Sequence, residues 1–233
     1  MLRSAGFALA ILAPLGAIAA LYAGRFCPLP RGRLVRTAAL CALTALVTAL
    51  ASAFLVHAGA AGSGLTATAQ STMRLLAILA LLEELSRFVV LGGYGLRPRY
   101  RSSARDGIVL GLVAGLTFAL LENVMTSMGD ASGFSGSGWI RVAMATPLHA
   151  LLGGLMGYLI VRAQAAPAGG PWKMLLALAA PVAIHIVYDT PVIVALAFWG
   201  DAMTPAVAGT AIALSALVDL ALAAGLYRLF RAA

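Results

Sequence analysis

Residues 107–127 read GIVLGLVAGLTFALLENVMTS, an almost unbroken apolar run in which Glu122 is the only ionisable side chain. A helix of about 20 apolar residues crosses a bilayer, so this run is long enough to span one. The chain as a whole has the same character, because 62% of its 233 residues are hydrophobic and 10% are charged. A water-soluble domain of this size keeps more polar surface, and we therefore predict an integral membrane protein.

The apolar runs predict an all-α fold, a polytopic transmembrane bundle of about seven helices that forms a single domain over residues 1–233. The connections between the runs are too short to hold a sizeable soluble domain. Glycines at small-xxx-small spacing in the fourth and fifth spans, which are Gly107, Gly111, Gly115, Gly153 and Gly157, predict close helix contact. The predicted spans are residues 5–24, 37–57, 72–92, 107–127, 139–162, 173–198 and 205–229.

The placement of positive charge predicts how the bundle sits in the membrane. Twelve of the 16 Lys and Arg residues lie on alternate connections or at the C-terminus, and such residues stay on the cytoplasmic side. We therefore expect the N-terminus outside and the C-terminus inside. The net charge of +8 comes from clusters between apolar runs rather than from one amphipathic face, so the lipid bilayer is an expected partner and nucleic acid is not.

Four of the predicted spans carry ionisable residues at a similar depth. Such a group costs several kcal/mol in hydrocarbon unless it is paired or lines a cavity. With a rise of about 1.5 Å per residue, all of them fall in the middle and outer half of the membrane. We therefore expect one polar site that opens outward. Its ionisable members are Glu83, Glu84 and Arg87 in 72–92, Glu122 in 107–127, His149 in 139–162, and His185 and Asp189 in 173–198.

The expected site has an excess of negative charge. Arg87 lies four residues after Glu83 and three after Glu84, so it can hold one carboxylate while the other points elsewhere. Four carboxylates against one guanidinium leave a net charge of −3 when both histidines are neutral. At least one carboxylate should therefore hold a proton, or a metal cation should be present. A carboxylate beside a histidine is suited to general acid–base catalysis.

These residues, in their order and spacing, resemble the PrsW family within the wider group of CPBP/CAAX-type glutamate intramembrane proteases. The resemblance covers residues 72–198, the helices expected to be catalytic. Two residues separate the glutamate pair from Arg87, and Glu122 stands where the CAAX prenyl endoprotease branch has a histidine, which favours the PrsW branch. The matching residues are Glu83, Glu84, Arg87, Phe118, Glu122, Asn123, His149, His185 and Asp189.

The resemblance implies that a peptide bond in or beside the membrane is hydrolysed by water that a glutamate activates. It implies Glu83 or Glu84 as the general base, with Arg87 fixing the second glutamate. It assigns His149 to assist the base or the leaving amine, and His185 with Asp189 to stabilise the oxyanion, while Phe118, Glu122 and Asn123 shape the site or contact the substrate. The implied substrate is a membrane-anchored protein such as an anti-sigma factor, cut on the extracytoplasmic side of a bacterial inner membrane.

Other interpretations of the polar cluster remain open. A proton- or cation-coupled transporter would also place carboxylates and histidines in the membrane, although no inverted repeat is visible in the sequence. A non-catalytic scaffold has no use for so costly a cluster. Within the protease interpretation no cofactor is predicted, yet Zn²⁺ is possible with Glu83, His149 and His185 as ligands. The absence of a His-Glu-x-x-His motif favours metal-free catalysis.

Overall fold

The computed structural model describes residues 29–62, 69–129, 136–166, 170–199 and 202–233, together with four single positions between residues 12 and 17. The predicted span 5–24 lies outside the described residues apart from those four positions. Throughout the described ranges the chain is helical and contains no strand, which confirms the predicted all-α fold.

Six long helices form the described part of the bundle, and each contains or nearly contains one of the predicted spans from 37–57 onward. Five of them are long and apolar enough to cross a membrane. The sixth, α3, carries the glutamate pair and Arg87, so charge rather than length sets it apart. The helices are α2 (Arg31–Gly62), α3 (Ala69–Val90), α4 (Ala104–Gly129), α5 (Gly136–Gln164), α6 (Gly170–Trp199) and α7 (Pro205–Ala232).

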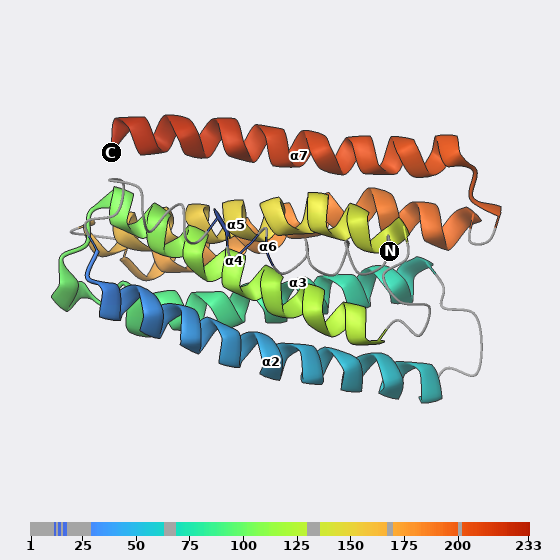
Figure 1. Ribbon diagram of the computed structural model, residues 1–233, viewed down its shortest axis with the longest axis horizontal. Helices are drawn as coiled ribbons and strands as arrows, with labels where there is room; N and C mark the ends of the chain where they lie inside the picture. Colours follow the sequence, from blue (N-terminus) through green and yellow to red (C-terminus); the bar gives the residue numbers. More distant parts are fainter. Residues whose placement is uncertain are drawn as a thin grey trace.

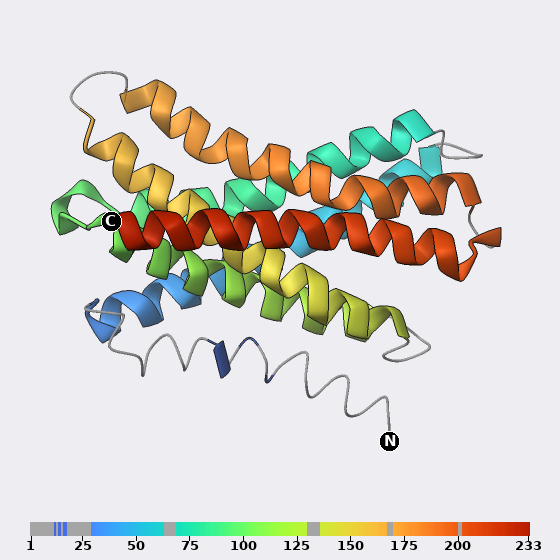
Figure 2. The same cartoon turned by 90° about the horizontal axis from the view of Figure 1, so that it is seen from above.

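The helices alternate in direction along the bundle. Figure 1 shows α7 along the top and α2 along the bottom, with α4, α5 and α6 between them. Seen from above in Figure 2, α7 lies over the seam between α5 and α6 and packs against both. The C-terminal end of α7 lies at the same end of the bundle as the start of α2 and the start of α6. We call this the basic end, because most of the described Lys and Arg residues lie there.

The closest contact in the bundle joins α4 to α5, and it is made of glycine backbone. A Cβ atom added at Gly111 would lie 2.0 Å from the carbonyl oxygen of Gly153. One added at Gly115 would lie 1.9 Å from the carbonyl oxygen of His149. The predicted close helix contact is therefore confirmed. Because Gly115 touches the backbone of His149 directly, this contact also fixes that histidine relative to the residues that follow on α4.

The end of α3 was not foreseen from the sequence. Its last turn widens into a π-helical segment, η1 (Leu91–Gly95), where the Leu96 N–H donates to the Leu91 carbonyl at 2.7 Å. Two side chains from other helices hold this segment: Arg33 Nε donates to the Gly95 carbonyl at 2.6 Å, and Gln164 Nε2 donates to the Leu96 carbonyl at 2.7 Å. A short 3-10 turn, η2 (Pro98–Tyr100), follows. The end of α3 is thus tied to α2 and α5.

The glycine contact gives a first prediction. We expect Gly111→Ala to destabilise the bundle by about 1–3 kcal/mol, because the new methyl group would overlap the backbone of α5. Thermal unfolding of the purified protein in detergent measures this. Gly209→Ala on α7 is the matched control, since a Cβ there meets nothing within 4 Å. Equal melting temperatures for the two variants would contradict the close contact.

Candidate active site

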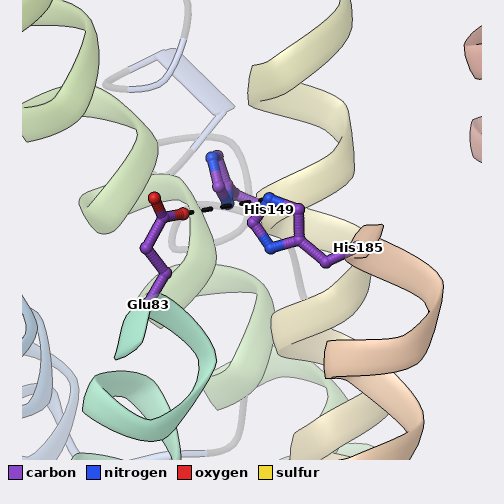
Figure 3. Close-up of side chains that lie close together, drawn as sticks. All are labelled: Glu83, His149 and His185. Atoms are coloured by element: carbon purple, nitrogen blue, oxygen red, sulfur yellow. Dashed lines mark ion pairs between the residues drawn. The ribbon is translucent and has the colours of Figure 1, made fainter. Parts of the chain in front are cut away.

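The structure brings the ionisable residues of α3, α4, α5 and α6 into one connected cluster. Figure 3 shows Glu83, His149 and His185 pointing toward one another from three different helices. The ring centroids of the two histidines are 5.4 Å apart, in an edge-on arrangement. Hydrogen bonds and ion pairs link these residues to the rest of the predicted set. Asp219 on α7 is not part of the cluster among the described contacts.

Arg87 forms the buried end of the cluster. Its Nη2 atom donates to Oε1 of Glu84, one turn earlier on α3, and both side chains have an exposed fraction of 0%. The guanidinium also lies over the Phe118 ring, 4.6 Å from the ring centroid. A cation over an aromatic face is stabilised by the ring's quadrupole. Arg87 therefore pairs with the second glutamate of the pair and leaves Glu83 to point elsewhere.

His149 connects α3 to α4. Arg87 Nη1 lies 2.8 Å from His149 Nδ1, and a guanidinium can only donate, so Nδ1 must accept this hydrogen bond. The imidazole proton is then on Nε2, which donates to Glu122 Oε2 at 2.7 Å. Both ring nitrogens are therefore engaged. The tautomer of His149 follows from its partners and not from the ring itself.

His185 connects α6 to α3. Its Nδ1 atom lies 2.9 Å from Glu84 Oε1, so Glu84 accepts hydrogen bonds from Arg87 and His185 on the same oxygen. Its Nε2 atom faces two further carboxylates, Asp189 Oδ2 at 3.4 Å and Glu83 Oε2 at 3.9 Å. Asp189 lies four residues after His185 on the same helix, so this pair needs no long-range folding to meet.

Exposure divides the cluster into a closed side and an accessible side. The side chains of His149 and His185 are 3% and 6% exposed, close to the value of 0% for Glu84. The side chains of Glu83, Glu122 and Asp189 are 17%, 23% and 32% exposed. Three carboxylates therefore form the part of the cluster that a substrate or water can reach. Within the described residues, Oε2 of Glu83 is buried and accepts no hydrogen bond, so the exposed part of this side chain lies elsewhere than at that oxygen.

The remaining two predicted site residues lie around the cluster. The Phe118 ring packs against His149, with 5.2 Å between the ring centroids, so it forms a wall of the site. Asn123 donates from Nδ2 to Thr146 Oγ1 at 3.0 Å and thereby joins α4 to α5. Thr146 was not predicted from the sequence as a site residue, and the only local signal for it was its position beside Pro147 in a mainly apolar span. Both Asn123 and Thr146 are buried.

The metal alternative can be tested against these contacts. Glu83, His149 and His185 each offer a ligand atom, and these atoms all lie within 4.8 Å of one another. Two histidines and a glutamate are a known donor set for catalytic zinc. However, His149 already uses Nδ1 to accept from Arg87 and Nε2 to donate to Glu122. The residue types and spacing therefore suit a metal, but the hydrogen bonds of His149 in this arrangement do not.

A known family model covers most of the chain. Residues 29–220 match the family model described as PrsW family intramembrane metalloprotease. The chain belongs to this family. The match extends beyond residues 72–198 and takes in α2 and the first part of α7, so the family unit is larger than the helices that carry the site. No curated protein and no solved structure matches the chain. As a PrsW family member it is an intramembrane protease.

The different burial of the two glutamates gives a second prediction. We expect Glu84→Gln to lower the melting temperature strongly, because breaking a buried ion pair costs about 3–5 kcal/mol. Glu83→Gln should leave it nearly unchanged, since Glu83 is partly exposed and Arg87 is held by Glu84. Thermal unfolding in detergent compares the two. A larger loss in Glu83→Gln would reverse the roles assigned to the pair.

Proposed function

We propose that this PrsW family protease cleaves a membrane-anchored protein by water that Glu83 activates, without a metal ion. The observation that carries the proposal is the different environment of the two glutamates. Glu84 is fully buried, and one of its oxygens is engaged by both Arg87 and His185. Glu83 is partly exposed, and its Oε2 atom is directed toward His185 at 3.9 Å. Glu83 is therefore the glutamate that can take a proton from a water molecule at the accessible side.

Glu84 and Arg87 act through the residues that they hold. Glu84 accepts from His185 Nδ1, which fixes the orientation of that ring and directs Nε2 toward the accessible carboxylates. We infer that a proton on His185 Nε2 is donated to the oxygen that becomes negative as water attacks the scissile carbonyl. A donor preorganised at that position stabilises the transition state. Asp189, 3.4 Å from Nε2, keeps the proton there before the substrate binds.

The second histidine lies on the other side of the cluster. His149 donates its Nε2 proton to Glu122, and Glu122 is itself partly exposed. We infer that this pair orients the leaving amine, which takes the proton that Glu83 removed from water, with Arg87 holding the ring from behind. Phe118 closes this side against lipid, because its ring packs on both Arg87 and His149. The two histidines thus have separate tasks, which follow from their different carboxylate partners.

The expected substrate is a membrane-anchored protein cut on the extracytoplasmic side, and an anti-sigma factor is the substrate class that the family resemblance suggests. The position of the accessible carboxylates supports cleavage on the extracytoplasmic side. Glu122 lies seven residues before the end of α4, or about 10 Å from the end of the bundle opposite the basic end. Positive residues stay on the cytoplasmic side, so the opposite end faces outward and the C-terminus inward. This orientation fits a bacterial inner membrane.

Cleavage by purified protein tests the proposal. We expect Glu83→Gln to reduce cleavage of a membrane-anchored candidate substrate in lipid vesicles by 100-fold or more. General acid–base catalysis contributes about 10²–10⁴-fold to the rate of a reaction, and this variant removes the base. Product formation is followed by gel electrophoresis and mass spectrometry. Asp219→Asn is the control, because Asp219 lies on α7 outside the cluster, and it should cleave like the wild type. Full cleavage by Glu83→Gln would remove Glu83 from the mechanism, and transport without cleavage would favour a transporter.

Metal analysis tests the metal-free part separately. We expect purified active protein to contain no stoichiometric zinc and to keep its activity in a chelator, because both ring nitrogens of His149 are engaged. Elemental analysis of the protein in detergent measures the metal content. One equivalent of zinc that both His149→Ala and His185→Ala remove would assign the metal to this cluster. Glu83 would then be a ligand, and the proposed role as base would be wrong.

A further inference from the structure

A groove on the far side of α6 is not used by the protease site. It has a volume of about 570 Å³, is lined by α5, α6 and α7, and is open along one side. All of its lining side chains are apolar, among them Leu155 of α5, Ile184 of α6 and Ala221 of α7. Along α7 it runs from Leu217 to Leu229, or about 18 Å. This length is close to the hydrocarbon thickness of one leaflet, about 15 Å.

Each helix around the groove has a cation near the basic end. Arg162 follows Leu155 by seven residues, and Arg228 follows Ala221 by seven, so each cation lies on the same helix face as its groove residue. Lys173 precedes Ile184 by eleven residues, which is three helical turns. All three cations are exposed and lie within five residues of the end of their helix. None of them forms an ion pair within the described part of the chain.

We propose that the groove binds an anionic phospholipid from the leaflet at the basic end. One acyl chain lies between α5, α6 and α7, and the phosphate lies among Arg162, Lys173 and Arg228. The apolar lining suits a hydrocarbon chain, and the length suits a chain that spans one leaflet. Three cations at headgroup depth favour a negatively charged headgroup over a zwitterionic one.

The volume of the groove argues against a protein helix as its occupant. A transmembrane helix is about 10 Å wide, so a segment 18 Å long needs about 1,400 Å³. The groove offers less than half of that volume. A zwitterionic lipid would fit the apolar part, but its own ammonium group offsets the charge of its phosphate and would be repelled by the three cations. The anionic phospholipid satisfies both parts of the site.

The groove also touches the helix that carries the site. Ile184 and Val187 line it on either side of His185 in sequence, and on the α7 side Ser215 Oγ donates to the Tyr188 carbonyl at 2.6 Å. A bound acyl chain would therefore fill the space between α6 and α7 next to the turn that contains His185 and Asp189. This binding site goes beyond the proposed function, and its test does not depend on proteolysis.

Native mass spectrometry of the purified protein with added lipid tests the acyl-chain part. We expect phosphatidylglycerol to bind with about one equivalent and phosphatidylcholine with the same chains to bind at least tenfold more weakly. Gly225→Phe should abolish the bound equivalent, because Gly225 lines the groove and a Cβ there meets nothing within 4 Å. Gly209→Phe is the matched control on the same helix, where a Cβ also meets nothing and no groove residue is replaced. It should bind lipid like the wild type.

Charge-neutralising variants test the headgroup part. Each of Arg162→Gln, Lys173→Gln and Arg228→Gln should lower the preference for phosphatidylglycerol about fivefold, the effect of one surface cation on an anionic lipid. Arg36→Gln removes an exposed cation from α2, at the same end but on the opposite side of the bundle, and should have no effect. Equal binding of both lipids by the wild type, or lipid retained by Gly225→Phe, would overturn the proposal. Loss of self-association in Gly225→Phe with lipid binding unchanged would also overturn it.

Discussion

A guanidinium buried among apolar helices is stable only where the protein itself compensates its charge, since water does not reach it. Arg87 meets this requirement with the Glu84 carboxylate, the Nδ1 atom of His149 and the face of the Phe118 ring. These partners come from α3, α5 and α4. The position of Arg87 therefore determines how three helices meet, and moving any one of them leaves a buried charge uncompensated. His185 and Glu122 are then oriented by groups that Arg87 already holds.

The backbone contact between α4 and α5 makes this arrangement possible. Glycines let the two helices approach until the carbonyl of His149 touches Gly115, and this brings the His149 ring within reach of Phe118 and Glu122. A side chain at Gly115 would separate the helices and lengthen both contacts. At the end of α3, just after Arg87, Arg33 and Gln164 hold the π-helical turn.

The two ends and two sides of the bundle have different chemistry. The accessible carboxylates of the cluster lie away from the basic end, which separates them from the Lys and Arg residues gathered there. The groove on the other side of α6 is apolar, and each helix that lines it carries an exposed cation near the basic end. One helix thus has a polar face toward the site, with His185 and Asp189, and an apolar face toward the groove, with Ile184 and Val187. Lipid on one face and substrate on the other would act on the same turn of α6.

The sequence alone determined the membrane-spanning helices, because apolar length is a local property, and it identified the residues that meet, because ionisable groups in hydrocarbon require partners. It also predicted the α4–α5 contact from glycine spacing. It could not choose between Glu83 and Glu84 as the partner of Arg87, since both lie within reach on one helix. Only tertiary contacts distinguish the two glutamates. His149 meets Arg87 across 62 residues of sequence, and His185 meets Glu84 across 101 residues. Three further features depend on contacts between helices, which no local sequence pattern encodes. These are the position of the proton on His149, the hydrogen bond from Asn123 to Thr146 and the π-helical end of α3.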